Sequence, residues 1–194
     1  MKGLTAEGLL KRLEKRPIIA AVRDPASNRQ AIRSPVAVIS MISTSIFELD
    51  GMVKEAHEGG KAVLLHIDLA EGLGRDDAAV RWCVERLGVD GLISTKPNLL
   101  RAAAELGVIT VQRFFMVDSA SLSHGKRILK NTPPELVEVL PAIAPKGIRQ
   151  LCEALEKPVI AGGLASEPLD VALALQAGAR AVSTGEPGLW GYTL

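Results

Sequence analysis

Short runs of apolar residues alternate with longer segments of helical periodicity along the whole chain. Eight of these runs have the length and composition of β-strands. They cover residues 17–23, 36–40, 62–68, 91–95, 108–113, 136–140, 158–162 and 181–183. Continuous apolar runs of this kind are typical of parallel strands that are buried on both faces, with helices packed on the sheet.

The segments between the runs carry helix signals. After the fourth run, Pro97 can occupy the first position of a helix that Gly107 ends. After the seventh run, Ser166 is a candidate N-cap for a helix that stops at Gly178. Both segments therefore read as the crossover helices of βαβ units.

Eight such units without a polar linker predict an α/β fold, in which residues 1–194 form one compact, TIM-barrel-like (β/α)8 domain. An open, doubly wound sheet is the alternative. The 194 residues allow about 24 per unit, against about 31 in a typical barrel. The helices must therefore be short. The segment 24–35 has room for little more than two turns, and only eleven residues follow Ser183.

Composition supports a globular protein and limits its partners. Hydrophobic residues make up 47% and charged residues 23%, which excludes a disordered chain. Aromatic residues make up only 3%, so the core must consist of Ala, Val, Ile and Leu. The net charge of +1 provides no overall positive field for nucleic acid. Binding of nucleic acid would need a local basic patch or an oligomer.

The two cysteines and the absence of long apolar segments indicate the compartment. Cys83 and Cys152 lie far apart without metal-ligand spacing, which excludes a disulfide scaffold and a zinc ribbon. No segment approaches the ~18 apolar residues of a membrane span, and the N-terminus lacks a signal peptide pattern. We expect a cytoplasmic protein without a membrane partner, and the sequence specifies no cofactor and no metal.

Polar residues gather at the carboxyl ends of the predicted strands, where (β/α)8 barrels carry their sites. Those that continue the alternation of apolar positions within their strands are Arg23, His66, Asp68, Lys96 (counted from Leu92), Glu138 and Ser183. Burying several charges is costly unless they are paired, so their convergence on one rim favours a polar ligand. The alternative is that they pair with one another and close the barrel mouth. For His66 alone, a hydrogen-bonded core position is favoured.

Two loops at the end of the chain fit a phosphate group. Gly162-Gly163 ends the seventh strand and Ser183-Thr184 ends the eighth. Barrels often bind phosphate with the loops after these strands, because glycines and hydroxyls expose donors to the anion. Tight turns are the alternative for each loop. Lys96 and Lys146 are candidate counter-charges.

Catalytic machinery is not specified by any motif. Asp68, with Glu71, could bind ligand hydroxyls or a hard cation. Glu138 could act as a general base, and a Schiff-base lysine has no support. The chain contains neither a nucleophile elbow nor a Walker loop. We therefore predict a ligand-binding protein and not an enzyme.

Basic residues form two local groups. The first is on the predicted first helix and consists of Lys11, Arg12, Lys15 and Arg16, and the second consists of Lys126, Arg127 and Lys130. Such groups are usually solvated helix faces. As an RNA-binding surface they would contact phosphates without reading the base sequence. The first group is our candidate for such a surface.

An ordered series of motifs resembles a known family, the glycerol-3-phosphate-responsive antiterminators, also called glycerol uptake operon antiterminator regulatory proteins. The matching residues are Lys61, His66-Ile67-Asp68, Glu71-Gly72-Leu73, Asp90 to Lys96, Gln112-Arg113-Phe114-Phe115, Asp118-Ser119, Glu138 to Pro141, Pro145-Lys146, Ile160 to Leu164, Ser183-Thr184 and Leu189-Trp190. The departures are Ala142, where the family has glycine, and Gly185, where a second serine is common.

The resemblance implies a barrel-like fold, glycerol 3-phosphate as effector, and binding to the leader mRNA of a glycerol-utilisation operon to prevent transcription termination. Two other functions stay open. One is an enzyme that acts on a small phosphorylated metabolite, since a fold does not fix a function. The other is a ligand-binding protein without an RNA surface. A homo-oligomer also stays open.

Overall fold

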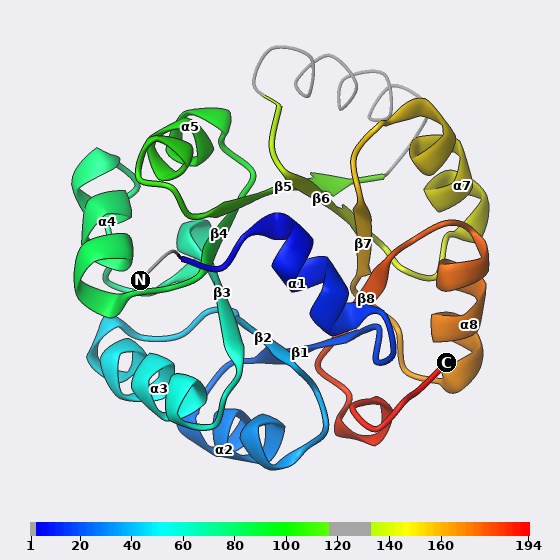
Figure 1. The fold of residues 1–194 in the computed structure, drawn as a ribbon, viewed down its shortest axis with the longest axis horizontal. Helices are drawn as coiled ribbons and strands as arrows, with labels where there is room; N and C mark the ends of the chain where they lie inside the picture. The colour runs from blue at the N-terminus through cyan, green and yellow to red at the C-terminus, as the bar shows by residue number, and fades with distance from the viewer. Residues whose placement is uncertain (1–2, 117–132) are drawn as a thin grey trace.

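A closed parallel barrel forms the centre of the molecule (Figure 1). The computed structural model describes residues 3–116 and 133–194. Within these ranges the strands pair in chain order around the barrel. They are β1 (Ile18–Val22), β2 (Val38–Met41), β3 (Ala62–His66), β4 (Gly91–Ser94), β5 (Ile109–Phe115), β6 (Leu136–Leu140), β7 (Val159–Gly162) and β8 (Ala181–Thr184). The predicted (β/α)8 barrel is confirmed, and the open sheet is excluded because β1 pairs with β8.

Short helices surround the barrel, as the length of the chain required (Figure 1). They are α2 (Pro25–Arg33), α3 (Ile46–Glu58), α4 (Asp77–Trp82), α5 (Pro97–Glu105), α7 (Pro145–Ala154) and α8 (Pro168–Gln176). The single turn Pro187–Leu189 follows β8. None of the helices in the described residues is long and apolar enough to cross a membrane.

The N-cap of α8 differs from the prediction. Glu167, and not Ser166, occupies the cap position before Pro168. The Asp170 carboxylate accepts hydrogen bonds from the backbone N–H groups of both Ser166 and Glu167, at 2.9 and 3.0 Å. Asp170 is the N3 residue, and its return to the N-cap N–H is one half of a capping box, so the helix begins one residue later than predicted.

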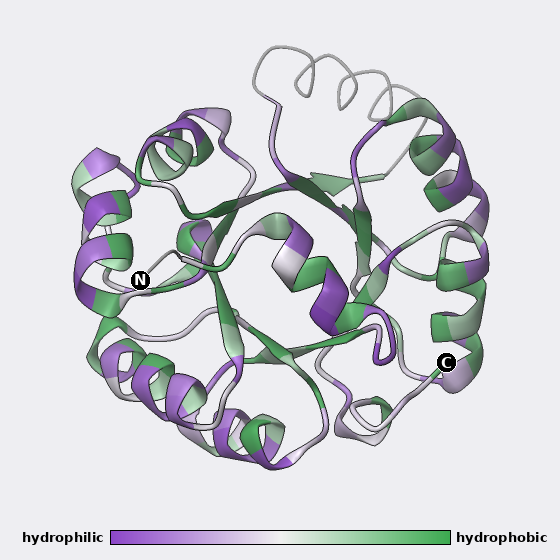
Figure 2. Cartoon of the chain, in the orientation of Figure 1, coloured by the Kyte–Doolittle hydropathy of each residue, from purple (hydrophilic) through white to green (hydrophobic). Residues whose placement is uncertain are grey.

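Helix α1 (Ala6–Leu13) crosses one end of the barrel and closes it (Figure 1). Leu9 and Leu13 belong to the apolar cluster that fills the barrel interior, with inward residues of the strands such as Ile19, Val38 and Leu64. A second apolar layer lies between the strands and the outer helices. In Figure 2 the strands are mostly hydrophobic, whereas α3, α4 and α7 show hydrophilic faces. The end opposite α1 is therefore the open mouth.

The interior cluster identifies the strand residues that face inward. Ile19, Leu64, Leu136 and Ala181 are members, so the alternation extends to Arg23, His66, Glu138 and Ser183 as predicted. The prediction for Lys96 is wrong, because Ile93 belongs to the interior cluster and Leu92 to the outer layer. The alternation from Leu92 therefore follows the outward face of β4.

Candidate ligand site at the barrel mouth

A cavity of about 420 Å³ opens at the carboxyl ends of the strands. Its lining includes Arg23, Arg113, Glu138 and Ser183, together with residues 163–166 and 184–186 of the loops after β7 and β8. The sequence places charged residues immediately above the apolar interior on β1, β5 and β6, and barrel closure brings them to one rim. The cavity combines these polar groups with the two loops predicted to bind phosphate.

His66, Arg113 and Glu138 form a buried cluster at the mouth, in which Arg113 and Glu138 line the cavity and His66 contacts both from outside the lining. Arg113 and Glu138 are direct cross-strand partners in the β5–β6 ladder. The Arg113 Nη1 donates a hydrogen bond to His66 Nδ1 at 3.0 Å, because a guanidinium can only donate. Glu138 Oε2 lies 3.5 Å from Arg113 Nε and 3.7 Å from His66 Nε2.

The environment of the cluster fixes the charge of His66. Its side chain is only 2% exposed. Burial, followed by the positive charges of Arg113 and Arg23, lowers the pKa of His66 well below its ordinary value. The imidazole is therefore neutral near pH 7. Since Nδ1 accepts from Arg113, the ring proton sits on Nε2, which faces Glu138.

Glu138 is the titrating member of the cluster. Burial raises its pKa to about 7, although Arg113 and a hydrogen bond from the Ser183 side chain act in the opposite direction. The carboxyl group therefore exchanges its proton near neutral pH. Its charge is then sensitive to any group that enters the mouth.

The loop after β7 has a backbone that suits an anion. Gly163 and Leu164 both have positive φ angles, 76° and 64°. A side chain at Gly163 would start 3.0 Å from Leu140 Cδ2. Within residues 3–116 and 133–194, the N–H groups of Gly163, Leu164 and Gly185 meet no acceptor. Successive free N–H groups of this kind form anion-binding concavities.

Thr184 lines the cavity and joins the two loops through its hydroxyl. Its Oγ1 donates to the Ala165 carbonyl at 2.8 Å and accepts from the Glu186 backbone N–H at 3.1 Å. The Thr184 carbonyl also accepts from the Trp190 indole at 3.0 Å. Thr184 therefore holds the loops after β7 and β8 together, and because it also lines the cavity, its predicted contact with phosphate stays a prediction.

Asp68 connects the ends of strands β3 and β4 through hydrogen bonds of its carboxylate. Strand β3 ends at His66, and Asp68 lies in the 3-10 turn Ile67–Leu69 that follows. Its carboxylate accepts hydrogen bonds from Ser94 Oγ at 2.6 Å, the Thr95 backbone N–H at 2.6 Å and Thr95 Oγ1 at 2.8 Å. Asp68 does not line the mouth cavity. The turn directs this carboxylate toward β4, and its predicted contact with ligand hydroxyls stays a prediction.

Substituting Asp68 with alanine should destabilise the protein by about 2–3 kcal/mol, because three hydrogen bonds to a carboxylate are lost and Ser94 Oγ is buried. Urea denaturation measures this effect. Asp50→Ala, at an exposed position of α3, is the matched control and should change stability by less than about 0.5 kcal/mol. A direct ligand role for Asp68 would instead leave stability unchanged.

Lys96 and Lys146 do not line the mouth. Lys96 is exposed at the start of α5 and does not follow the inward face of its strand. Lys146 lines a groove between α7 and α8 with Arg149 and Leu173.

The basic residue of the mouth that the sequence patterns did not select is Arg113. Its position two residues after the inward Val111 was the signal that could have identified it.

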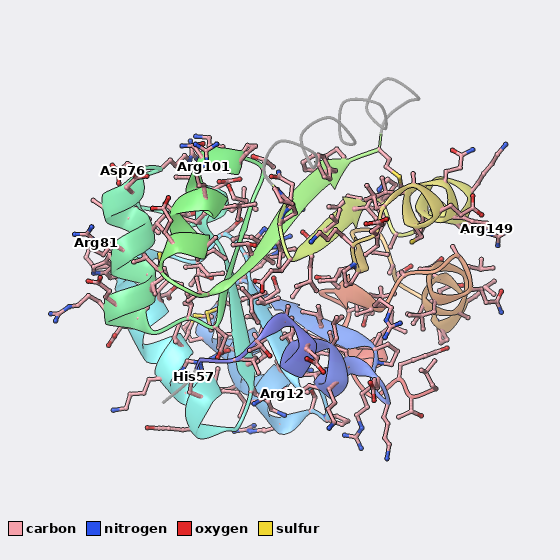
Figure 3. All side chains as sticks on the ribbon, turned by 45° about the horizontal axis from the view of Figure 1, so that its top comes forward. Arg12, His57, Asp76, Arg81, Arg101 and Arg149 are labelled. Carbon is pink, nitrogen blue, oxygen red and sulfur yellow. The ribbon has the colours of Figure 1, made fainter. Side chains whose placement is uncertain are left out.

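The first basic group lies at the closed end of the barrel. Helix α1 ends at Leu13, so Lys15 and Arg16 follow the helix and do not extend its face as predicted. Arg12 Nη1 donates to the Gly60 carbonyl at 3.5 Å, and Arg16 Nη1 to the Pro35 carbonyl at 3.0 Å. In Figure 3, Arg12 lies with α1, whereas Arg101 and Arg149 lie on the outer helices.

The second basic group and one family motif fall outside the described residues. They are Lys126, Arg127 and Lys130, and Asp118-Ser119.

Comparison with known proteins identifies the family. The family described as "Glycerol-3-phosphate responsive antiterminator" matches residues 18–190. The chain belongs to this family. Among solved structures, a glycerol uptake operon antiterminator regulatory protein from Listeria monocytogenes str. 4b F2365 is 34% identical, with a TM-score of 0.86 over 90% of this chain and 95% of the other.

Two further relatives match almost the full length of this chain. A glycerol uptake operon antiterminator-related protein from Thermotoga maritima MSB8 is 31% identical, with a TM-score of 0.80 over 92% of this chain and 99% of the other. The uncharacterized protein YgcP of Escherichia coli (strain K12) is 35% identical over 182 residues, which cover 94% of this chain and 95% of the relative. The resemblance found in the motifs is therefore confirmed.

Proposed function

We propose that this antiterminator binds glycerol 3-phosphate in the barrel mouth and acts on the leader mRNA of a glycerol-utilisation operon. Membership of the family supports the effector. The observation that carries the proposal is the mouth cavity, whose lining combines the Arg113–Glu138 pair with two loops that have N–H groups without an acceptor in the described residues. Such a cavity has donors for a phosphate at one side and a hydrogen-bonding cluster for hydroxyls at the other.

The phosphate is proposed to lie between the loops after β7 and β8, held by N–H groups of Gly163, Leu164 and Gly185. Gly162 and Ser183 pair in the β7–β8 ladder and keep these loops adjacent. Arg23 lines the same cavity and provides a counter-charge. The glycerol hydroxyls then point toward Glu138, and Asp68 takes no part because its carboxylate is already engaged.

A second function is favoured by one observation. The raised pKa of Glu138, about 7, is the value expected of a general base that works near neutral pH. An enzyme that acts on a small phosphorylated metabolite is therefore the alternative. Three hydroxyl side chains of the described residues line the cavity, those of Ser166, Ser183 and Thr184, and His66 Nδ1 is engaged with Arg113 rather than with any of them. The lining therefore contains no histidine-activated nucleophile, and membership of the antiterminator family favours a sensor.

The RNA surface is proposed to include the basic group at the closed end of the barrel. Arg12 and Arg16 are bound to backbone carbonyls, whereas Lys11 and Lys15 are exposed. These lysines can reach RNA phosphates without breaking a contact of the fold. Because the mouth is at the opposite end, ligand binding must be coupled to RNA binding through the barrel itself.

Gel-shift titrations with the leader transcript of the chain's own glycerol operon test this function. RNA affinity should rise about tenfold or more when glycerol 3-phosphate is present. The reason is that a ligand that binds the RNA-competent state more tightly than the incompetent state shifts the equilibrium toward the competent one. The charge-reversal variant Lys11→Glu/Lys15→Glu should lose RNA affinity and show a weaker salt dependence, with ligand affinity unchanged. Equal RNA affinity with and without ligand, or steady turnover of glycerol 3-phosphate, would overturn the proposal.

A further inference from the structure

Three buried polar atoms at the mouth, two on residues that line the cavity and one on His66 beside them, have no hydrogen-bond partner among the described residues. They are His66 Nε2, Arg113 Nε and Glu138 Oε2. The side chains of His66 and Glu138 are 2% and 4% exposed. An unpaired buried polar atom is costly, and three that converge on one point indicate a place where another polar group binds.

The distances within the cluster are longer than those of direct hydrogen bonds. Glu138 Oε2 is 3.5 Å from Arg113 Nε and 3.7 Å from His66 Nε2, without hydrogen-bond geometry in either case. Each of the three atoms therefore keeps its capacity for a further hydrogen bond. On the β7 side the neighbour is Gly162, where a Cβ would start only 3.1 Å from Glu138 Oε1, so a side chain at that position would crowd the carboxylate.

The chemistry of the three atoms specifies which oxygen fits. Glu138 Oε2, when ionised, can only accept a hydrogen bond, while Arg113 Nε and His66 Nε2 donate. An alcohol can donate to the carboxylate and accept from a donor at the same time. A carbonyl oxygen can only accept a hydrogen bond. It therefore leaves the Glu138 carboxylate without a donor and places its own lone pairs against those of the carboxylate.

We propose that His66, Arg113 and Glu138 form a subsite that selects a secondary alcohol over a carbonyl at the carbon next to the phosphate-bearing carbon of the ligand. This inference rests on the proposed function, because the phosphate loops must first hold the ligand in the mouth. It assigns discrimination to Glu138, the one member of the cluster that is an obligate acceptor when ionised.

The selection depends on the charge of Glu138. The charged and titratable groups around it are Arg113 from β5 and His66 from β3, which is neutral near pH 7. Arg23 after β1 acts through its effect on His66. From β8 it meets the Ser183 side chain, and β7 provides only Gly162. When Glu138 is protonated it can donate to a carbonyl, so the preference for the alcohol decreases at low pH.

Calorimetric titration with three compounds tests the subsite. Glycerol 3-phosphate carries the alcohol, dihydroxyacetone phosphate carries a carbonyl at that carbon, and 3-hydroxypropyl phosphate carries no oxygen there. At pH 8 the protein should prefer glycerol 3-phosphate over both by about 10- to 100-fold, the loss expected when a buried charged acceptor stays unpaired. At pH 5.5 the preference over the carbonyl compound should fall severalfold.

Glu138→Gln separates this role from a purely structural one. Its amide can donate to a carbonyl, so the preference for the alcohol over the carbonyl compound should fall below about threefold and lose its pH dependence, while affinity for inorganic phosphate stays unchanged. Glu186→Gln, which changes the other carboxylate in the cavity lining, should keep the preference.

The outcomes distinguish the two proposals. The subsite is overturned if the protein binds glycerol 3-phosphate and dihydroxyacetone phosphate with equal affinity. It is also overturned if folded Glu138→Gln keeps the preference of the unmodified protein. Both outcomes leave the proposed function intact. Failure of the unmodified protein to bind either glycerol 3-phosphate or inorganic phosphate overturns the proposed function itself.

Discussion

Replacing Arg113 with methionine should destabilise the protein by about 3–5 kcal/mol at pH 8, the cost of removing one partner of a buried ion pair. Methionine preserves the volume and flexibility of the arginine stem. It leaves Glu138, which is 4% exposed, without the guanidinium that opposes the effect of burial on its pKa. The hydrogen bond to His66 Nδ1 is lost as well.

The effect of Arg113→Met should depend on pH. In the unmodified protein the pKa of Glu138 is raised from 4.5 to about 7, so the folded state holds a proton that the unfolded state has released. The contribution of this group to stability is fully present below pH 4.5 and is lost as the pH rises through about 7. Without Arg113 the pKa rises further, so the variant should lose more stability above pH 7 than below pH 5.

Two controls isolate the buried charge. Arg113→Met/Glu138→Leu removes both partners and should recover most of the stability lost at pH 8, because no unpaired charge remains. Arg81→Met breaks the exposed pair with Glu85, which is 3.9 Å long, and should cost less than about 0.5 kcal/mol. Chemical denaturation at pH 5 and pH 8 provides the measurements. A pH-independent loss in Arg113→Met would contradict the electrostatic explanation.

Replacing Gly163 with valine should weaken binding of glycerol 3-phosphate by at least about 100-fold. Gly163 has a φ of 76°, which a β-branched residue adopts only at a cost. Its Cβ would start 3.0 Å from Leu140 Cδ2, and Leu140 lines the mouth cavity. The loop must shift, and the free N–H groups of Gly163 and Leu164 then lose their common direction toward the anion.

Gly60→Val is the matched control for this variant. Gly60 has a similar φ of 74°, a Cβ at this position would meet only open space, and the residue lies beside α1 at the closed end of the barrel. Both variants should lose about 1–2 kcal/mol of stability from backbone strain. Only Gly163→Val should lose ligand affinity, measured by calorimetry. Unchanged affinity in folded Gly163→Val would refute the phosphate position.

The barrel could be predicted because alternation and length are local properties of the sequence. Each apolar run overlaps one strand, although β5 continues to Phe115 and β8 to Thr184 beyond the predicted ends. The inward alternation reaches His66, Glu138 and Ser183 in the structure as predicted. For Lys96 the prediction failed because Gly91 begins β4 and the choice between Leu92 and Ile93 as the inward residue has no local signal. A one-residue change of register reverses the face of every side chain in a strand.

The partners of the polar residues could not be predicted from sequence. Asp68 follows His66 by two residues, which suggested a shared face, but a 3-10 turn after His66 directs its carboxylate to Ser94 and Thr95. Thr184 likewise was assigned to the ligand, and the structure uses it to join two loops. Both positions depend on contacts between residues distant in the chain, which spacing along a strand does not reveal.

A crystal structure of the protein with glycerol 3-phosphate tests the central claim most directly. We expect the phosphate between the loops after β7 and β8, within hydrogen-bond distance of the Gly163 and Gly185 N–H groups, and a ligand hydroxyl bonded to Glu138 Oε2. A phosphate bound elsewhere on the chain, with the mouth cavity free of ligand, would contradict the assignment of the barrel mouth as the sensing site.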